Sequence, residues 1–167
     1  MTKYDRAAAR GIGGVKAGGN YAADVVPSAE AKEAGFPIAL YLDSTEHKYI
    51  EEFSTSNFIA ISQDGNYVTP KSPSILPSVM NRSLRQIALD LGMEVEERPV
   101  TWEEVSEFKE VAACGTAVVL TPIASLTHGS QKVEFGDFSQ FQVMYDRVRQ
   151  IQLGEFEDTH GWMMTIE

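Results

Sequence analysis

A series of short β-prone segments separated by turn signals constrains the fold of this chain more than any other feature. The segments are rich in Val, Ile, Tyr, Phe and Thr, the residue types that favour strands. They comprise Pro37 to Asp43, Tyr49 to Ser54, Phe58 to Ser62 and Tyr67 to Thr69. Asp64-Gly65 between the last two is a typical hairpin turn. This spacing predicts a meander of antiparallel strands.

Helical patterns follow and flank this meander. The apolar spacing after Pro77-Ser78 predicts a helix over Ser78 to Gly92, and a closing helix is expected over Phe138 to Leu153. An earlier helix is predicted over Tyr21 to Ala34, ending at Gly35, with Pro27 in a first turn or a kink. Thr101 opens a short helix with Glu104 in capping-box spacing, and Val95 to Val100 and Val111 to Ile123 are further β-prone runs. Because strict βαβ alternation is lacking, the pattern favours an α+β fold with a mainly antiparallel, barrel-like sheet flanked by helices over a doubly wound fold.

Size and composition narrow the class of protein. A chain of 167 residues predicts one domain. The net charge of −10 argues against nucleic acid as a partner, since a phosphate-binding surface needs clustered Lys and Arg. Cys114 is the only cysteine, which excludes an intrachain disulfide, and the three histidines lack metal-ligand spacing, so no metal site is expected. No segment is of membrane-spanning or signal-peptide type, so we expect a soluble, cytoplasmic protein with no membrane partner.

Lys16 is the first candidate for chemistry because glycines flank it on both sides, at 13–14 and 18–19. Small neighbours would let a planar ligand approach the backbone, and a desolvated lysine amine is a nucleophile. On composition alone, a flexible loop with a solvated lysine is the better interpretation. The glycines do not match a dinucleotide or nucleoside-triphosphate loop, because the preceding strand and the Lys-Ser/Thr ending are both missing.

Four ordered motifs decide between these interpretations. They are Lys16-Ala17-Gly18-Gly19-Asn20-Tyr21, the segment from Tyr49 to Asn57, Ile75-Leu76-Pro77-Ser78 before a helix, and Gly115-Thr116-Ala117. Together they resemble the motifs of fold-type IV pyridoxal-phosphate enzymes, and the Gly-Gly-Asn-Tyr run resembles branched-chain amino acid aminotransferases in particular. The resemblance extends from about Arg6 to the His160-Gly161-Trp162 tail.

The resemblance implies a role for each matching residue around pyridoxal 5′-phosphate. Lys16 would hold the cofactor covalently and, once displaced by a substrate amine, move the substrate proton. Glu52 would pair with the protonated pyridine nitrogen, and Glu51 should point away from it because neighbouring strand residues face opposite sides. Tyr21 would bind the phenolic oxygen of the cofactor. Arg6 matches an arginine near the cofactor in some family members, although a solvated arginine explains it as well.

The remaining implied residues bind the phosphate and the substrate. Val79 and Met80 would offer backbone N–H groups at a helix N-terminus, and Thr116 would add a hydroxyl and an N–H to the phosphate. Thr55, Thr116 and Ala117 would lie on the substrate side. Each has an ordinary alternative: Glu52 a solvated strand carboxylate, Tyr21 a core tyrosine, and Thr116 part of a plain turn between strands.

Two kinds of departure from the family are visible. The first is local: Ser78 stands where glycine is common, and Asn81-Arg82 replaces a more usual Thr-Arg order. The second is length, because complete members of the family have a smaller N-terminal domain that this sequence lacks. The chain is therefore expected to be the C-terminal cofactor-binding domain, residues 1–167, from a gene fragment, a split gene or a cut at a domain boundary. Its exposed face toward the missing domain should be apolar, and self-association into a homodimer is expected.

The implied activity is transamination of leucine, isoleucine and valine with 2-oxoglutarate, so amino acids and 2-oxo acids would be the small-molecule partners. One alternative is a truncated, non-catalytic domain that binds pyridoxal phosphate without turnover, since an incomplete site loses most of its orienting power. Another is a D-amino-acid aminotransferase or aminodeoxychorismate lyase relative on the same fold. The Gly-Gly-Asn-Tyr run and Gly115-Thr116-Ala117 favour the branched-chain type.

Overall fold

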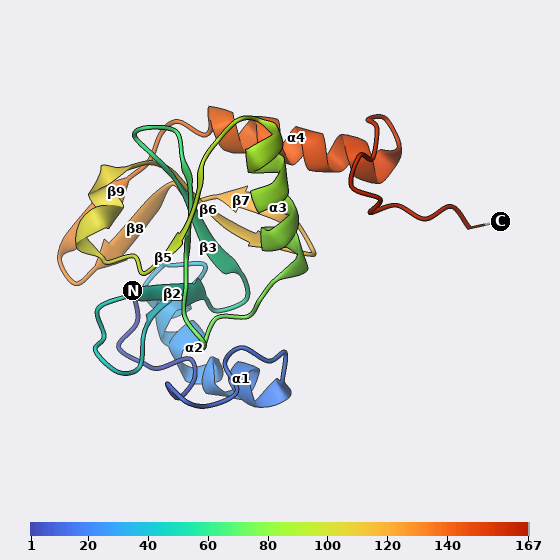
Figure 1. Ribbon diagram of the computed structural model, residues 1–167. Coiled ribbons are helices and arrows are strands. Elements are labelled where there is room, and N and C mark those ends of the chain that lie inside the picture. The colour runs from blue at the N-terminus through green and yellow to red at the C-terminus, as the bar shows by residue number, and fades with distance from the viewer. Residues whose placement is uncertain (167) are drawn as a thin grey trace.

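Strand β3 lies at the centre of the sheet. The computed structural model describes residues 1–166. The strands of the main sheet are β1 (Leu40–Leu42), β2 (Ile50–Phe53), β3 (Asn57–Ser62), β4 (Tyr67–Pro70), β5 (Val95–Arg98), β6 (Phe108–Gly115) and β7 (Val119–Pro122). One edge of β3 pairs with β6, and the other pairs with β2 at its start and β4 near its end (Figure 1).

The sheet curls because the segment after β5 returns to β2. All neighbouring strands are antiparallel except β4 and β5, which run parallel. Beyond β5, the Ile50 N–H donates to the Val100 carbonyl at 2.7 Å, and Tyr49 bridges Thr101. A separate hairpin of β8 (Ser125–His128) and β9 (Gln131–Glu134) completes this side. The result is the mainly antiparallel, barrel-like arrangement that the sequence predicts.

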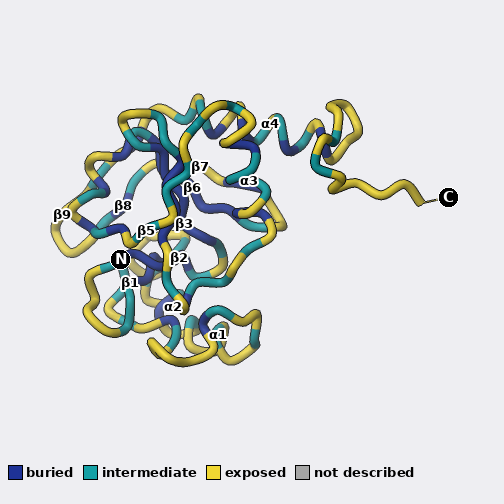
Figure 2. The backbone as a smooth tube through the Cα atoms, viewed as in Figure 1, coloured by how far each residue is buried: buried dark blue, intermediate teal, exposed yellow. Residues whose placement is uncertain are grey.

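Strand alternation divides the core into two clusters. In β3, Phe58 and Ala60 face one cluster while Ile59 and Ile61 face the other, as the period of two requires. The first cluster fills the space between the sheet, the β8–β9 hairpin and the short helix η1 (Glu103–Glu107). The second is covered by α3 (Val79–Asp90) and α4 (Ser139–Leu153), and Figure 2 shows the buried strands between these layers.

Two short helices lie at the end of the molecule opposite α4. These are α1 (Gly18–Ala23) and α2 (Val25–Glu33), and they follow the Lys16 loop directly (Figure 1). The predicted single helix over Tyr21 to Ala34 is therefore two helices, since the chain turns at Asp24. Pro27 lies in the first turn of α2, and Gly35, with a φ of 84°, ends the segment as expected.

One β region predicted as a single run is a hairpin, and a second hairpin was not predicted. The single run predicted over Val111 to Ile123 is the hairpin β6–β7, turned at Thr116–Val118. The β8–β9 hairpin was not predicted, although Gly129, with a φ of 59°, marks its turn. The helices predicted over Ser78–Gly92 and Phe138–Leu153 agree with α3 and α4 within two residues. None of the helices within residues 1–166 combines the length and apolar character needed to cross a membrane.

Candidate functional site

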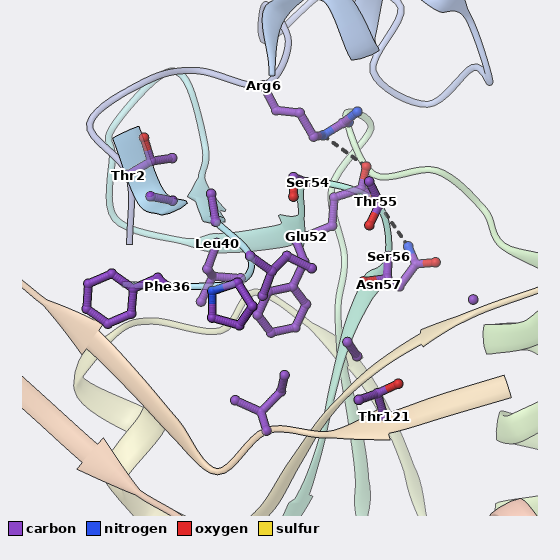
Figure 3. A pocket seen from close by; sticks show the side chains of 18 of the residues that line it. Thr2, Arg6, Phe36, Leu40, Glu52, Ser54, Thr55, Ser56, Asn57 and Thr121 are labelled. Carbon is purple, nitrogen blue, oxygen red and sulfur yellow. Dashed lines mark hydrogen bonds and ion pairs between the residues drawn. The ribbon is translucent and has the colours of Figure 1, made fainter. Parts of the chain in front are cut away.

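Glu52 is the buried carboxylate of the site. It lies on β2, is 6% exposed, and accepts a hydrogen bond from the Asn57 amide Nδ2 at 3.0 Å. Arg6 Nε lies 2.9 Å from Glu52 Oε1, a charge contact rather than an aligned hydrogen bond. Figure 3 shows Arg6 and Asn57 approaching Glu52 from two sides. Neither Arg6 nor Glu52 is solvated, so the alternatives of a solvated arginine and a solvated strand carboxylate are wrong.

The pKa of the Glu52 carboxyl is raised to about 7, mainly because burial penalises its charged form. The positive charge of Arg6 lowers the pKa but does not offset the burial. The ion pair and the burial therefore act in opposite directions on the pKa, and burial has the larger effect. Only part of the Arg6 guanidinium is directed at the carboxylate. The Arg6 Nη2 donates instead to the Gly13 carbonyl at 3.1 Å and to the Ser74 carbonyl.

Glu51, the neighbour of Glu52, points to the other side of the sheet as predicted. Its carboxylate accepts a hydrogen bond from the Ser72 hydroxyl at 2.6 Å and lines a separate cavity of about 270 Å³. Burial raises the pKa of Glu51 as well. The two adjacent carboxylates therefore serve different surroundings, and only Glu52 faces the larger cavity.

Lys16 and Tyr21 form a direct pair at the rim. The Lys16 Nζ donates to the Tyr21 hydroxyl at 2.8 Å and lies 5.5 Å from the centre of the Tyr21 ring. Asn20 shapes the loop between them, because its amide donates to the carbonyls of Ile12 and Val15, each at 2.9 Å. Tyr21 is 43% exposed, so the alternative of a core tyrosine is wrong.

The glycines before Lys16 serve packing. A Cβ at Gly13 would lie 2.5 Å from the Ser74 carbonyl oxygen, and one at Gly14 would lie 2.8 Å from the Pro73 carbonyl oxygen. The glycines after Lys16 differ, since a Cβ at Gly18 would meet no atom within 4 Å and one at Gly19 would only contact Ile12 Cδ1 at an ordinary 3.8 Å. The first pair therefore lets the Lys16 loop lie against the segment that leads to α3, while the second pair leaves space open.

The N-terminus of α3 offers free donors. Ser78 caps the helix by accepting a hydrogen bond from the Asn81 N–H at 3.2 Å. Within residues 1–166, the N–H groups of Val79 and Met80 have no acceptor, as is usual for a first helical turn. Asn57 ties this turn to the carboxylate, because its Nδ2 also donates to the Leu76 carbonyl at 3.0 Å.

The segment Gly115-Thr116-Ala117 forms the start of the turn from β6 to β7. Thr116 and Ala117 are exposed there, and Gly115 pairs with Val119 across the hairpin. Val119 has a φ of 64°, a conformation that is strained for a β-branched residue. The turn is therefore held by the two strands in an unusual backbone form.

One cavity of about 1480 Å³ brings nearly all of these groups together. Figure 3 shows the part of its lining that includes Arg6, Glu52 and Thr55. Of the residues predicted from the sequence, those that line it are Arg6, Lys16, Tyr21, Glu52, Thr55, Val79, Thr116 and Ala117. Met80 is the exception: its side chain packs in the core between sheet and helices, so only its backbone N–H faces the turn. No role was predicted for Asn57, although an Asn that opens a β-prone run is unusual and was a usable signal.

The cysteine and two of the histidines have surroundings that indicate a structural role rather than a chemical one. Cys114 is fully buried beside this cavity, and burial raises the pKa of its thiol to about 12, so it remains a thiol at neutral pH. His47 lies 3.3 Å from Asp5, and His160 lies 2.7 Å from Asp90. No group of three potential metal ligands occurs within residues 1–166.

Comparison with known proteins places these observations in a family. The family model "Amino-transferase class IV" matches residues 6–126. A branched-chain-amino-acid aminotransferase of Helicobacter pylori is 43% identical over 169 residues, covering 99% of this chain and 49% of that protein. The chain spans about half the length of the curated relatives it matches.

Solved structures agree with the sequence comparison. The branched-chain amino acid aminotransferase from Escherichia coli has a TM-score of 0.81 at 30% identity, covering 98% of this chain and 55% of that one. A T.th. branched-chain amino acid aminotransferase complexed with N-(5′-phosphopyridoxyl)-L-glutamate has a TM-score of 0.83 at 26% identity, covering 99% of this chain and 55% of that one.

Proposed function

The chain belongs to the class IV aminotransferase family, and we propose that residues 1–167 form the C-terminal, pyridoxal-phosphate-binding domain of a branched-chain amino acid aminotransferase. The observation that carries the proposal is the cavity shared by the Lys16–Tyr21 pair and the buried Glu52–Arg6 pair. A nucleophilic amine and a buried carboxylate are the two groups that this cofactor requires at opposite ends of its ring.

The state of Glu52 fits a pyridine nitrogen. Its carboxylate is desolvated and has a pKa of about 7, so a cationic N–H partner would favour the ionised form. Arg6 cannot supply this fully, since its guanidinium is shared with the carbonyls of Gly13 and Ser74. We therefore assign Glu52 to the pyridine nitrogen and Arg6 to the support of Glu52.

The start of α3 fits a phosphate. The N–H groups of Val79 and Met80, which have no acceptor among the described residues 1–166, lie at the positive end of a 12-residue helix, where an anion is stabilised. Thr116, across the cavity, adds a hydroxyl. These groups come from different parts of the chain, which favours recognition of one extended ligand over separate small ions.

The residues would then divide the reaction between them. Pyridoxal phosphate, when bound, supplies an aldehyde and an electron-withdrawing ring. Lys16 would hold the cofactor by its amine, and its Nζ would accept the proton from the substrate Cα. Tyr21 would position Nζ through their hydrogen bond, and Glu52 would hold a proton on the ring nitrogen. Thr55, Thr116 and Ala117 would orient the substrate.

The relatives support a proposal for the substrates. We propose leucine, isoleucine and valine as amino donors and 2-oxoglutarate as acceptor, in a cytoplasmic homodimer. Relatives from Helicobacter pylori and Haemophilus influenzae are named for branched-chain amino acids, and one related structure holds a phosphopyridoxyl adduct of glutamate. This favours the branched-chain type over a D-amino-acid aminotransferase or aminodeoxychorismate lyase.

The apolar rim of the cavity supports the proposal that a partner covers it. Several of the side chains that line the cavity are exposed and apolar, namely Val15, Phe36, Val79 and Val118. Such a surface is typical of an interface, and the chain spans only about half of its relatives. We propose that the other half of a complete enzyme covers this rim. The open rim also favours a second candidate function, a domain that binds the cofactor without turnover.

Cofactor uptake at Lys16 is the direct test. Pyridoxal phosphate added to the chain should give a visible absorbance band, and borohydride should then fix the cofactor on the Lys16 peptide. Lys132 lines the same cavity but pairs with Glu134 at 2.6 Å, so Lys132→Ala is the matched control and should label normally. Loss of label in Lys132→Ala rather than Lys16→Ala would overturn the proposal.

A coupled transaminase assay then separates the two candidate functions. Turnover of leucine that Lys16→Ala abolishes would exclude the non-catalytic function, and labelling without turnover would favour it. D-Alanine as the better donor would overturn the branched-chain assignment.

A further inference from the structure

The helices that carry Tyr21 have little apolar anchoring of their own. Among the residues of α1 none is buried, and in α2 only Pro27 is. Figure 2 shows this pair as a mostly exposed segment at the end of the molecule. Tyr21 nevertheless has to keep its hydroxyl 2.8 Å from Lys16 Nζ. Something other than hydrophobic packing must therefore hold α1 in place.

A polar bond from the sheet reaches the junction of the two helices. The Tyr41 hydroxyl on β1 donates to Asp24 Oδ1 at 2.5 Å, and Asp24 Oδ2 accepts from the Ser28 hydroxyl at 2.6 Å. Asp24 is the residue between α1 and α2, and its own N–H donates to the Tyr21 carbonyl at 3.2 Å. The carboxylate therefore lies one helical turn from the residue that contacts Lys16.

Tyr41 is well placed to act as a fixed donor. Its strand neighbours Leu40 and Leu42 face the hydrophobic core, so alternation turns Tyr41 to the opposite side, where it is fully buried. Burial and the adjacent Asp24 carboxylate raise the pKa of the Tyr41 hydroxyl, which keeps its proton. Strand β1 also pairs with β2, the strand of Glu52, through Leu40 with Phe53 and Leu42 with Ile50.

We infer that Tyr41 and Asp24 are a pair of positioning residues that hold the Lys16–Tyr21 contact at a fixed place relative to Glu52. The bond joins α1 to β1, the strand that pairs with the strand of Glu52. The Lys16 end and the Glu52 end of the cofactor site are therefore both held by the same sheet. A charge-assisted hydrogen bond is among the stronger side-chain interactions, and here it replaces missing apolar contacts. The role toward the cofactor rests on the proposed function.

Hydrogen exchange of the chain without cofactor tests whether the Tyr41–Asp24 hydrogen bond, here called the tether, holds α1 in place. Tyr41→Phe keeps the ring and removes only the donor, so the amides of residues 20–24 should exchange at least about tenfold faster while those of β3 and β6 are unchanged. Asp24→Asn should act in the same direction. Ser28→Ala is the matched control, because it removes the other partner of Asp24 without breaking the link to the sheet, and it should stay within about twofold.

A double-mutant cycle on Lys16 separates positioning from general loosening. Tyr21→Phe should change the acetylation rate of Lys16, relative to Lys109, in the intact chain. In the Tyr41→Phe chain the same change should be less than half as large, because the Lys16–Tyr21 contact is already less populated. Unchanged exchange in residues 20–24, or additive effects on Lys16, would overturn the inference.

Cofactor uptake distinguishes a failure of the Tyr41–Asp24 tether from a failure of the proposed function. If the intact chain takes up pyridoxal phosphate on Lys16 but Tyr41→Phe shows neither effect, the tether is wrong and the proposed function remains. If both effects occur but the intact chain does not take up the cofactor, the proposed function is wrong, and with it the role of the tether toward the cofactor.

Discussion

Replacing Glu52 by Gln should stabilise the cofactor-free chain at alkaline pH. The carboxyl has a pKa of about 7 in the folded chain against an ordinary value of 4.5, so folding favours its protonated form. Each pKa unit corresponds to about 1.4 kcal/mol, so ionisation of Glu52 lowers the free energy of unfolding by about 3 kcal/mol at pH 8. Gln is a neutral isostere of the protonated carboxyl and does not ionise, so the chain with Gln does not lose this free energy.

The sign of the pH dependence follows from the direction of the pKa change. Below pH 4.5 the carboxyl is protonated in both the folded and the unfolded chain, and its full contribution to stability is present. Between pH 4.5 and about 7 the folded chain binds more protons than the unfolded chain, so the free energy of unfolding falls as pH rises. Above about 7 the loss is complete.

Urea unfolding at pH 5 and pH 8 measures this effect. The wild-type chain and Glu52→Gln should have similar free energies of unfolding at pH 5 and differ by about 3 kcal/mol at pH 8, with Gln the more stable. Subtracting the two chains removes other titrating groups, including Glu51, whose raised pKa acts in the same direction. A Gln variant that is less stable than the wild type at pH 8 would show that Arg6 stabilises the ionised carboxylate more than burial destabilises it.

Three further changes test the scaffold. Glu110→Ala should lower the free energy of unfolding by about 3 kcal/mol, because this fully buried carboxylate accepts two backbone N–H bonds at the start of α4, each 2.9 Å long; urea unfolding is the measurement, and a loss under about 1 kcal/mol would contradict it. Gly13→Ala should cost about 2 kcal/mol through overpacking and weaken cofactor uptake, whereas Gly18→Ala, with open space at its Cβ, should cost nothing; equal effects in thermal unfolding would refute this contrast. Leu84→Ala in the core face of α3 should cost about 3 kcal/mol while the 53%-exposed Leu89→Ala costs under about 0.5, and calorimetry would reveal whether the two differ.

Local patterns were enough to predict most elements and the placement of the charged groups. Period-two alternation separated Glu52 from Glu51, and the capping signal at Ser78 located the start of α3. These features depend on neighbours within a few residues, so a single sequence contains them. The gathering of the candidate residues around one cavity followed from four ordered motifs rather than from local pattern.

The features that the sequence did not predict depend on contacts between distant segments. The Arg6–Glu52 pair joins residues from the first loop and β2, and Tyr41 with Asp24 joins β1 to a helix junction. Pro27 allowed either a first turn or a kink within Tyr21 to Ala34, and the sequence alone did not choose between them; in the structure Pro27 lies in the first turn of α2, after the break at Asp24. The β8–β9 hairpin was missed because its strands are four residues each and largely polar.

The unfavourable features of this chain are concentrated around the cavity. Glu52 is buried with a raised pKa, Val119 is held at a φ of 64°, and the N–H groups of Val79 and Met80 have no acceptor within residues 1–166. The first two lower the stability of the chain alone, and a ligand with a cationic N–H at one end and an anionic group at the other would relieve Glu52 and bind the N–H groups of α3. A fold selected only for stability would replace Glu52 by a neutral residue and so regain about 3 kcal/mol. The retained carboxylate is therefore best explained by a ligand that binds it, which makes stability and binding at this site thermodynamically linked.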